Sequence, residues 1–487
     1  MHFSSYRVGM THGPDNGSWR DLLGGRQLGI VTVLAGGVAL YATNVYLTTS
    51  LLPSAVADIG GERFYAWVTT VYLIASVSAA TVVSPLLGWA GPRRAYLLAF
   101  GAFAAGTLVC AAAPGMQVML AGRAVQGAAG GLLAGLAYAV INLALPQRLW
   151  VRASALTSAM WGVGTFVGPA AGGLFAQFGL WRWAFVTLAL ITVGIAATVP
   201  TVLTRTETAK SETARRRVPV RSLLVLTTAA SLIAVAGLQS ALPAMAGLIV
   251  GAAALTILFV ILDRRSGAPV LPRTVFAHNP LKWIYLTIAV LAVASMVETY
   301  IPFFGQRLGH LIPLTAGFLG ATLAFGWTVG EMISASAHAR AVSRVVTLAP
   351  AVVAAGLILA GALQRDGSSA PEMALWALGF AVTGAGIGMA WPHLAAAAMS
   401  VSMDAAESGA AAAAISTVQL IAGAFGAGFA GVLVNLGGSP TRGAHLLFLG
   451  FAAITITGVA VSSRVFRGGS RLEVTDKAGE EAVQAPL

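Results

Sequence analysis

The sequence predicts an all-α integral membrane protein with fourteen transmembrane helices. Three observations carry this prediction: 57% of the 487 residues are apolar, only 9% are charged, and the apolar residues fall into long runs. An ordinary soluble domain carries roughly 25% charged residues, so this chain has too few charges to cover a water-soluble globule. The single cysteine excludes a disulfide-stapled scaffold.

Fourteen apolar runs follow one another along the chain, and most have the roughly 20 residues that a membrane crossing requires. They lie near 28–51, 64–87, 95–113, 116–143, 149–177, 181–203, 222–238, 242–262, 283–304, 312–337, 342–363, 372–396, 408–435 and 443–463. The run at 222–238 is short, and the last two are rich in Ala and Gly.

The basic residues orient these spans. With the N-terminus in the cytoplasm, 23 of the 29 Lys and Arg residues fall in cytoplasmic segments, five fall outside, and Arg123 lies within a span. Cytoplasmic loops of membrane proteins are enriched in Lys and Arg. We therefore expect an even number of crossings with both termini cytoplasmic, and we attribute the net charge of +12 to these loops rather than to nucleic-acid binding.

Ionised side chains within spans are functional candidates, because an isolated charge costs about 2.5–3.5 kcal/mol there. Arg123 shares a helical face with Gly127 and Gly130, which would let a neighbouring helix approach closely. We favour a role in transport over a purely structural pairing with backbone carbonyls.

Two glutamates are candidates for proton binding. Glu298 lies four residues before Pro302, and a carboxylate that loads and releases a proton is what proton coupling needs. The alternative for Glu298 is a hydrated position at the outer interface. Glu331 lies near the cytoplasmic end of its span, where we expect a structural or gating role.

Other polar and aromatic residues within the spans are candidates to line a substrate cavity, although such residues often pack or anchor a helix at the interface. They are Asn44, Tyr46, Tyr72, Tyr138, Asn142, Trp161, Trp327, Trp391, His393 and Gln419. We expect no metal and no bound cofactor, because the sequence has no cluster of metal ligands, no phosphate-binding Gly-rich loop and no nucleophile elbow. An enzyme is therefore disfavoured.

Several runs resemble motifs of drug:H+ antiporters of the major facilitator superfamily, in the branch with fourteen spans. The run Trp161 to Gly173 is similar to the family's fifth-helix motif, with Gly164, Gly168, Pro169, Gly172 and Gly173 in place and Trp181-Arg182-Trp183 after it. Arg123, Gln126 and Gly127 resemble the fourth-helix motif, in which the arginine is tied to proton transfer. Asn44 to Pro53 resembles the first-helix motif, and Gly91, Arg93 and Arg94 resemble the gating motif after the second helix.

The resemblance implies two six-helix bundles separated by two extra helices. The chain then divides into a tail (1–27), a first bundle (28–203), a basic linker (204–221), the extra pair (222–262), a second linker (263–282), a second bundle (283–463) and a final tail (464–487). This chain also departs from the family. Asn44 and Gly88 stand where the family usually has Asp, and Ser84 where it usually has Gly.

We therefore expect a monomeric multi-pass protein of the cell membrane that exports small amphipathic compounds by alternating access, driven by the proton gradient. The missing aspartates place the expectation of proton coupling on Glu298 and Glu331. One alternative is a metabolite or lipid carrier without proton coupling, and a more remote one is a membrane sensor or enzyme.

Overall fold

The computed structural model describes residues 18–203, 219–267, 269–271, 275, 281–399 and 405–466. Within these ranges the side chains of residues 142, 151, 339, 340, 399 and 405–413 are not described. Most of both predicted tails and of the basic linker lies outside the described residues. So does the side chain of Asn142, which stays a prediction as a cavity residue.

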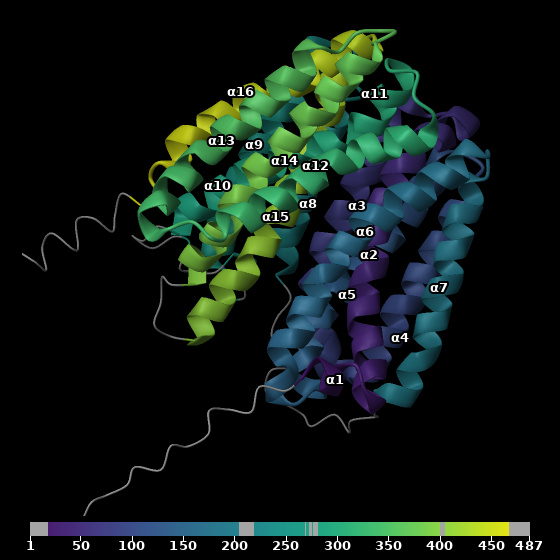
Figure 1. The fold of residues 1–487 in the computed structure, drawn as a ribbon, viewed down its shortest axis with the longest axis vertical. Helices are drawn as coiled ribbons and strands as arrows, with labels where there is room; N and C mark the ends of the chain where they lie inside the picture. Colours follow the sequence, from purple (N-terminus) through teal and green to yellow (C-terminus); the bar gives the residue numbers. More distant parts are fainter. Residues whose placement is uncertain are drawn as a thin grey trace, which may run out of the picture.

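Every regular element in these ranges is a helix (Figure 1). Twelve of the described helices are long and apolar enough to cross a membrane, so the chain is an integral, multi-pass membrane protein. Two of the fourteen predicted spans, at 64–87 and 222–238, fall on helices of 16 and 17 residues, α3 and α8, and do not meet that length.

The first half of the chain begins with a short helix at one end of the molecule and continues through six longer ones. They are α1 (Trp19–Leu22), α2 (Gly25–Ile59), α3 (Tyr65–Ala80), α4 (Val83–Ala111), α5 (Met116–Ala144), α6 (Trp150–Gln177) and α7 (Trp181–Val202).

The boundary between α3 and α4 differs from the predicted spans. The helix is interrupted at Thr81, four residues before Pro85, because a proline has no N–H to donate to that carbonyl. Helix α4 then contains a reversal at Gly91, whose φ of 70° is left-handed and favours glycine. The chain thus runs from Tyr65 to about Ala90 in one direction and returns from Pro92.

The second half contains six further long segments, the first of which is broken. They are α10 (Leu281–Ser295) with the 3₁₀ turn η5 (Met296–Tyr300) and α11 (Ile301–Arg307), then α12 (Pro313–Ser334), α13 (Ala339–Ala362), α14 (Ala370–Met399), α15 (Ala405–Gly437) and α16 (Pro440–Ser462). Pro302 occupies the first turn of α11, and 3₁₀ geometry inside a long helix often marks a hinge.

The two halves use one packing scheme. In the first half α2 packs on α6, α3 on α5, and α4 on both α5 and α7; in the second half α10 packs on α15, α12 on α14, and α13 on both α14 and α16. Between the halves, α3 packs against α15 and α6 against α12. Both of these contacts pair the second segment of one half with the fifth of the other, and a smaller contact joins α12 to α2.

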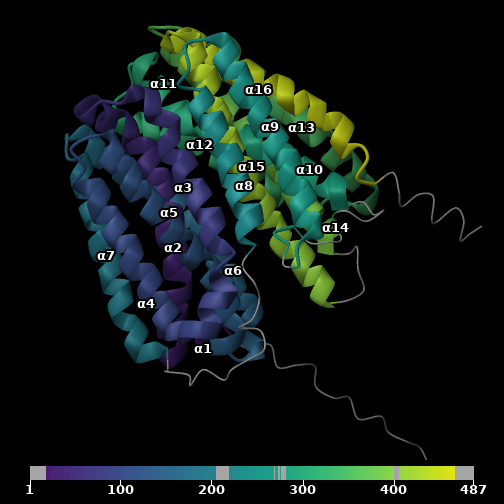
Figure 2. The same ribbon diagram turned by 180° about the vertical axis from the view of Figure 1, so that it is seen from behind.

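The halves touch near one end of the molecule and diverge toward the other (Figures 1 and 2). We call the touching end, formed by the segments near residues 60–64, 308–313 and 438, the outer end, and the opposite end, where α1 lies, the inner end. At the outer end Gly173 of α6 adjoins Leu314 of α12, and Gly317 of α12 adjoins Ser50 of α2.

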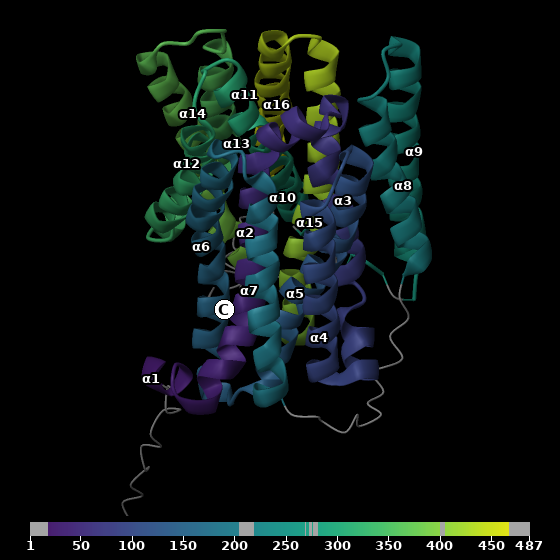
Figure 3. The ribbon, with the colours of Figure 1, turned by 90° about the vertical axis from the view of Figure 1, so that its right-hand side faces the viewer.

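The helices α8 (Val220–Ala236) and α9 (Leu242–Arg265) form a separate pair at the edge of the molecule (Figure 3). Helix α8 packs against α3 and α15, and so covers the seam at which these two helices meet. Helix α9 packs on α8 and exposes an apolar face to the surroundings, with Val250 68% and Ile257 64% exposed.

Candidate functional site

Arg123 lies in the middle of α5 and is 2% exposed. Its guanidinium donates to the backbone oxygen of Val68 (3.2 Å), to Thr48 Oγ1 (3.3 Å), to Gln126 Oε1 (2.9 Å) and, closer still, to Asn44 Oδ1. These acceptors come from α2, α3 and α5. Arg123 therefore joins three helices of the first half through neutral partners.

The neutral character of this cluster follows from the sequence. No acidic side chain pairs with Arg123 in the described part of the chain, and Asn44 stands where a carboxylate would form an ion pair. Several charge-assisted hydrogen bonds offset the cost of removing the guanidinium from water. Gln126 extends the cluster, because its Nε2 donates to Thr107 Oγ1 of α4 (2.9 Å).

Close helix contact brings this cluster together. A Cβ atom added at Gly127 would lie 2.2 Å from the backbone oxygen of Tyr72, and one at Gly131 would lie 2.2 Å from that of Ser76. Only glycine allows α3 to lie this near to α5. The predicted Gly-lined face next to Arg123 therefore packs against α3.

A row of aromatic rings leads from Arg123 to the surface. The guanidinium carbon lies 4.0 Å from the centre of the Tyr72 ring. The ring centres of Tyr72 and Tyr41 are 5.6 Å apart, and those of Tyr41 and Trp161 of α6 are 5.4 Å apart. Tyr72 and Tyr41 are buried, whereas Trp161 is 39% exposed. A cation over an aromatic face is stabilised by the ring quadrupole, so the row holds the charge in place and connects it to an exposed ring.

Tyr138 of α5 lies on the inner side of Arg123. It is 45% exposed, and its hydroxyl is 3.1 Å from Ser158 Oγ of α6.

The glycines of α6 face α2. Added Cβ atoms would lie 2.6 Å from Ala42 at Gly164, 2.5 Å from Tyr46 at Gly168, and 2.4 Å from the Leu47 oxygen at Gly172. The next residue, Gly173, faces α12 of the other half instead, as does the backbone oxygen of Pro169. The predicted bare face therefore packs within the first half, and only its outer end reaches the second.

Glu298 lies on η5, where the first segment of the second half is broken. Among the described residues it has neither an ion-pair nor a hydrogen-bond partner, and its side chain is only partly exposed. The turn η5 contacts α2, α12 and α15, and the Tyr46 hydroxyl on α2 is near enough to interact electrostatically with the carboxylate. Glu298 thus lies between the halves, below their outer contact.

Trp327 and Trp391 form a second aromatic pair, in the inner part of the second half. Their ring centres are 5.0 Å apart and both are half-buried. Glu331 follows Trp327 by one turn and its carboxylate interacts with the Trp327 side chain. His393 Nε2 is 3.0 Å from the backbone oxygen of Ser334. In the described ranges no three His, Cys, Asp or Glu residues gather as metal ligands would.

Ion pairs mark the outer end. Asp58 pairs with Arg182, Glu62 with Arg307 (3.6 Å), His310 with Asp366 (3.1 Å), and Arg365 with Glu372. Of these four pairs, which are those of the described residues, the pair of Glu62 and Arg307 joins the two halves.

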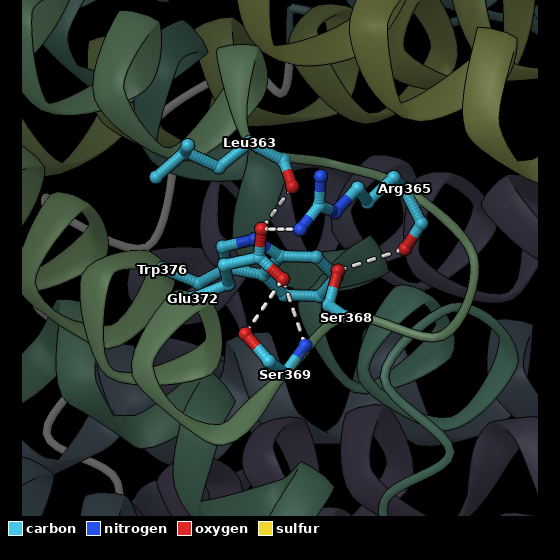
Figure 4. A network of polar contacts seen from close by, with 6 residues as sticks. All are labelled: Leu363, Arg365, Ser368, Ser369, Glu372 and Trp376. Carbon is cyan, nitrogen blue, oxygen red and sulfur yellow. Dashed lines mark hydrogen bonds and ion pairs between the residues drawn. The ribbon is translucent and has the colours of Figure 1, made fainter.

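Figure 4 shows how one of these pairs is built into the start of α14. Glu372 accepts from both the backbone N–H and the hydroxyl of Ser369 (2.8 Å each), while Trp376 donates to the Leu363 oxygen (3.1 Å). A carboxylate that accepts from the first turn stabilises the start of a helix.

Two basic residues of the described chain lie at the inner end, at the corner of α4. Gly91 forms the corner of α4, and neither Arg93 nor Arg94, directly after it, has an ion-pair partner within the described ranges. Arg93 is half-buried and Arg94 is exposed.

The chain matches the family description Major Facilitator Superfamily over residues 34–427. It is 54% identical over 466 residues to a probable multidrug-efflux transporter of Mycobacterium tuberculosis, with 94% of this chain and 98% of that protein aligned. The chain belongs to the major facilitator superfamily. It is thus a transporter of small molecules and not an enzyme.

More distant members of the superfamily agree with this assignment. Multidrug resistance protein 3 of Bacillus subtilis is 23% identical over 387 residues, which cover 76% of this chain and 72% of that one. A crystal structure of a mutant of the nucleoside transporter NupG superposes with a TM-score of 0.63 at 12% identity, over 91% of this chain and all of that one. At such low identity the structural likeness speaks for the fold alone.

Sequence reasoning missed three side chains of the Arg123 cluster, Thr48, Tyr41 and Thr107, and the backbone oxygen of Val68. A signal for two of them was present, because Tyr41, Asn44 and Thr48 recur at three- and four-residue spacing and so share one face of α2 with each other. Thr107 gives no such signal, since its role depends on how α4 packs against α5.

Proposed function

We propose that this member of the superfamily is a proton-coupled exporter of small amphipathic compounds, of the multidrug type, that works as a monomer by alternating access. This proposal is supported by the 54% identity to a mycobacterial protein described as a probable multidrug-efflux transporter. One observation carries the coupling: Glu298 is a carboxylate without a described partner, placed between two halves that must move against each other. Its neutral and charged forms would favour different arrangements of these halves.

We further propose that the chain crosses the cell membrane fourteen times with both termini cytoplasmic. The run from Tyr65 to Ala90 is interrupted but continuous in direction, and about 26 residues of helix reach some 39 Å. Helix α8, with 17 residues, is at the lower limit for a bilayer core of about 30 Å. Arg93 and Arg94 at the inner end, which have no ion-pair partner in the described part of the chain, and the paired arginines Arg182, Arg307 and Arg365 at the outer end fit a cytoplasmic inner end.

In this scheme the arrangement described above is open toward the cytoplasm. The halves touch at the outer end, while the inner aromatic residues Trp161 and Tyr138 are exposed. The ion pair between Glu62 and Arg307 has both side chains more than half exposed, and such pairs contribute about 0–1 kcal/mol. The outer contact is therefore held mainly by close helix packing, at Gly173 and Gly317.

Arg123 would keep the first half in one geometry through the cycle. A permanently charged side chain that is bonded to three helices resists their separation. The titrating group would then be Glu298 in the second half. Its charge would act on α2 through the electrostatic interaction with the Tyr46 hydroxyl. Moving a two-state equilibrium from 1:99 to 99:1 takes about 5.5 kcal/mol, so proton and substrate binding would both contribute.

The test is transport in proteoliposomes with Glu298→Gln, which keeps the shape of the side chain but cannot release a proton. We expect substrate accumulation driven by a pH gradient to be lost, while exchange of labelled for unlabelled substrate without a gradient continues. Glu372→Gln is the control, because Glu372 is an acid of the outer end that is already paired, and we expect it to keep both activities.

Two results would contradict the proposal. If Glu298→Gln transports normally against a gradient while Glu331→Gln does not, the proton site is Glu331. If the unsubstituted protein moves substrate at the same rate with and without a pH gradient, the carrier is uncoupled, as expected for a metabolite or lipid carrier.

A further inference from the structure

A groove lies at the inner end, on the peripheral side of the corner in α4. It has a volume of about 300 Å³ and is lined by Trp89, Ala90, Arg94, Leu97 and Leu98. The reversal at Gly91 creates it, because the chain on the two sides of this residue forms the two walls. Trp89 is 73% exposed and Leu98 is 51% exposed. Helix α4 packs mainly on α5 and α7 of its own half and not on the second half, so the groove opens to the surroundings of the protein and not to the space between the halves.

The groove continues as an apolar stripe along α4. Arg94, Leu98, Gly101, Ala105 and Leu108 follow one another at spacings of four and three residues, and each is exposed. Such spacing places them on one face of the helix. Gly101 has no side chain, and a Cβ atom there would have nothing within 4 Å. The surface is therefore recessed and open between Leu98 and Leu108. A hydrocarbon chain fits along such a path.

The head of the stripe is positive. Arg94 and Arg93 have no ion-pair partner in the described part of the chain, and Gly88, one turn before Pro92, supplies no carboxylate. A tryptophan beside them is typical of the depth at which lipid headgroups meet acyl chains. The groove therefore combines an unpaired cation, an interfacial aromatic ring and an apolar track below it.

We propose that this groove binds one anionic phospholipid of the leaflet at the inner end. Its phosphate lies against the Arg94 guanidinium, its glycerol region against the Trp89 ring, and one acyl chain along Leu98, Gly101 and Ala105. A net negative headgroup fits better than a zwitterionic one, because no acidic side chain at the groove would pair with a choline or ethanolamine group.

The experiment uses the full-length protein in bilayers that contain phosphatidylcholine and a small share of brominated lipid. Bromine quenches nearby tryptophans, and the part that belongs to Trp89 is the difference between the unsubstituted protein and Trp89→Phe. We expect brominated phosphatidylglycerol to quench this part at about fivefold lower mole fraction than brominated phosphatidylcholine, the factor that one basic residue near an anionic lipid contributes.

Three variants decide the role of Arg94. Arg94→Gln should abolish the preference for phosphatidylglycerol, and Arg94→Lys should keep most of it. Arg20→Gln removes an exposed arginine of α1 at the same end and should leave the preference unchanged. Because Arg94 and Arg20 are exposed, both variants should fold, which gel filtration verifies.

Three outcomes would overturn the proposal. Equal quenching by the two brominated lipids would show that the groove does not select charge. An equal loss of preference in Arg20→Gln would assign the effect to the general surface potential. Displacement of brominated phosphatidylglycerol by millimolar inorganic phosphate would identify a site for free phosphate rather than for lipid.

Discussion

A disulfide across the outer contact tests whether the two halves must separate there. Ser50 of α2 and Gly317 of α12 belong to different halves, and a Cβ atom built on Gly317 lies 3.2 Å from that of Ser50. Disulfides join Cβ atoms about 3.5–4.5 Å apart, so a small retreat of α12 accommodates the bond. The only native cysteine, Cys110, is fully buried in the first half and should not compete.

We expect Ser50→Cys combined with Gly317→Cys to crosslink under a membrane-permeant oxidant and to stop transport. Because the bond is covalent, the remaining transport rate should equal the share of molecules that escaped crosslinking, and a reductant should restore the rest. Transport is measured as substrate flux in proteoliposomes, and the crosslinked share by mass spectrometry of the intact protein.

The matched control lies within the second half. A Cβ atom at Gly305 of α11 would be 3.4 Å from that of Ala316 of α12, nearly the same separation. If each half moves as a body, the crosslinked pair Gly305→Cys and Ala316→Cys should transport normally. Full activity of a completely crosslinked Ser50 and Gly317 pair would refute the reasoning, since the outer contact would then not need to open.

Two further predictions concern the Arg123 cluster. Gly127→Ala would place a Cβ atom 2.2 Å from the backbone oxygen of Tyr72, and we expect it to lower the free energy of unfolding by about 1–3 kcal/mol. Gly194→Ala, where the added Cβ atom has nothing within 4 Å, should raise the free energy of unfolding by up to about 1 kcal/mol. Thermal unfolding measures both changes. Equal melting of the two would disprove the close contact. Asn44→Ala should cost about 1–3 kcal/mol by removing an acceptor of Arg123, while Asn44→Asp should keep stability because a carboxylate also accepts from the guanidinium. A larger loss for Asp than for Ala would show that the charge of Arg123 is already satisfied.

Composition and charge were enough to predict the membrane class and a helical fold, because spanning helices have a fixed length and an apolar surface. The prediction of a span at 283–304 is confirmed by the long apolar segment Leu281–Arg307, but it did not foresee the 3₁₀ turn η5 before Pro302. The run at 64–87 likewise gave no account of the interruption at Thr81 before Pro85. Proline signals were visible in both runs. Whether a proline bends, interrupts or breaks a helix depends on the helices packed around it, which one sequence does not reveal.

The candidate residues were predicted less completely than the fold. Arg123 and Glu298 stand out in any sequence because charges are rare in spans. Two partners in the Arg123 cluster do not stand out, because Val68 contributes a backbone oxygen and Thr107 is an ordinary residue of a membrane helix. Thr48 was recognisable only from its spacing to Asn44. Helix packing also decides which neighbour each glycine of α6 contacts, namely α2 for Gly164, Gly168 and Gly172, and α12 for Gly173. The sequence of α6 alone does not show this.

An internal repeat explains how the two halves acquire the same packing and different chemistry. The segments 122–131 and 379–388 are identical at six of ten positions, with Gly122, Gly127 and Gly131 matching Gly379, Gly384 and Gly388. The matched glycines serve the same contacts: Gly127 and Gly131 admit α3 to α5, and Gly384 and Gly388 admit α12 to α14. This signal was present in the sequence and would have predicted the equivalence of the halves.

Within the repeat, Phe380 occupies the position of Arg123 and Thr383 that of Gln126. Phe380 is buried and packs against Phe448, 5.3 Å between ring centres, so an apolar contact replaces the polar cluster. The fixed positive charge then belongs to one half, and Glu298 belongs to the other. If the close glycine contacts keep each half rigid, a change in the charge of Glu298 acts on the relation between the halves rather than on their interiors, as alternating access requires.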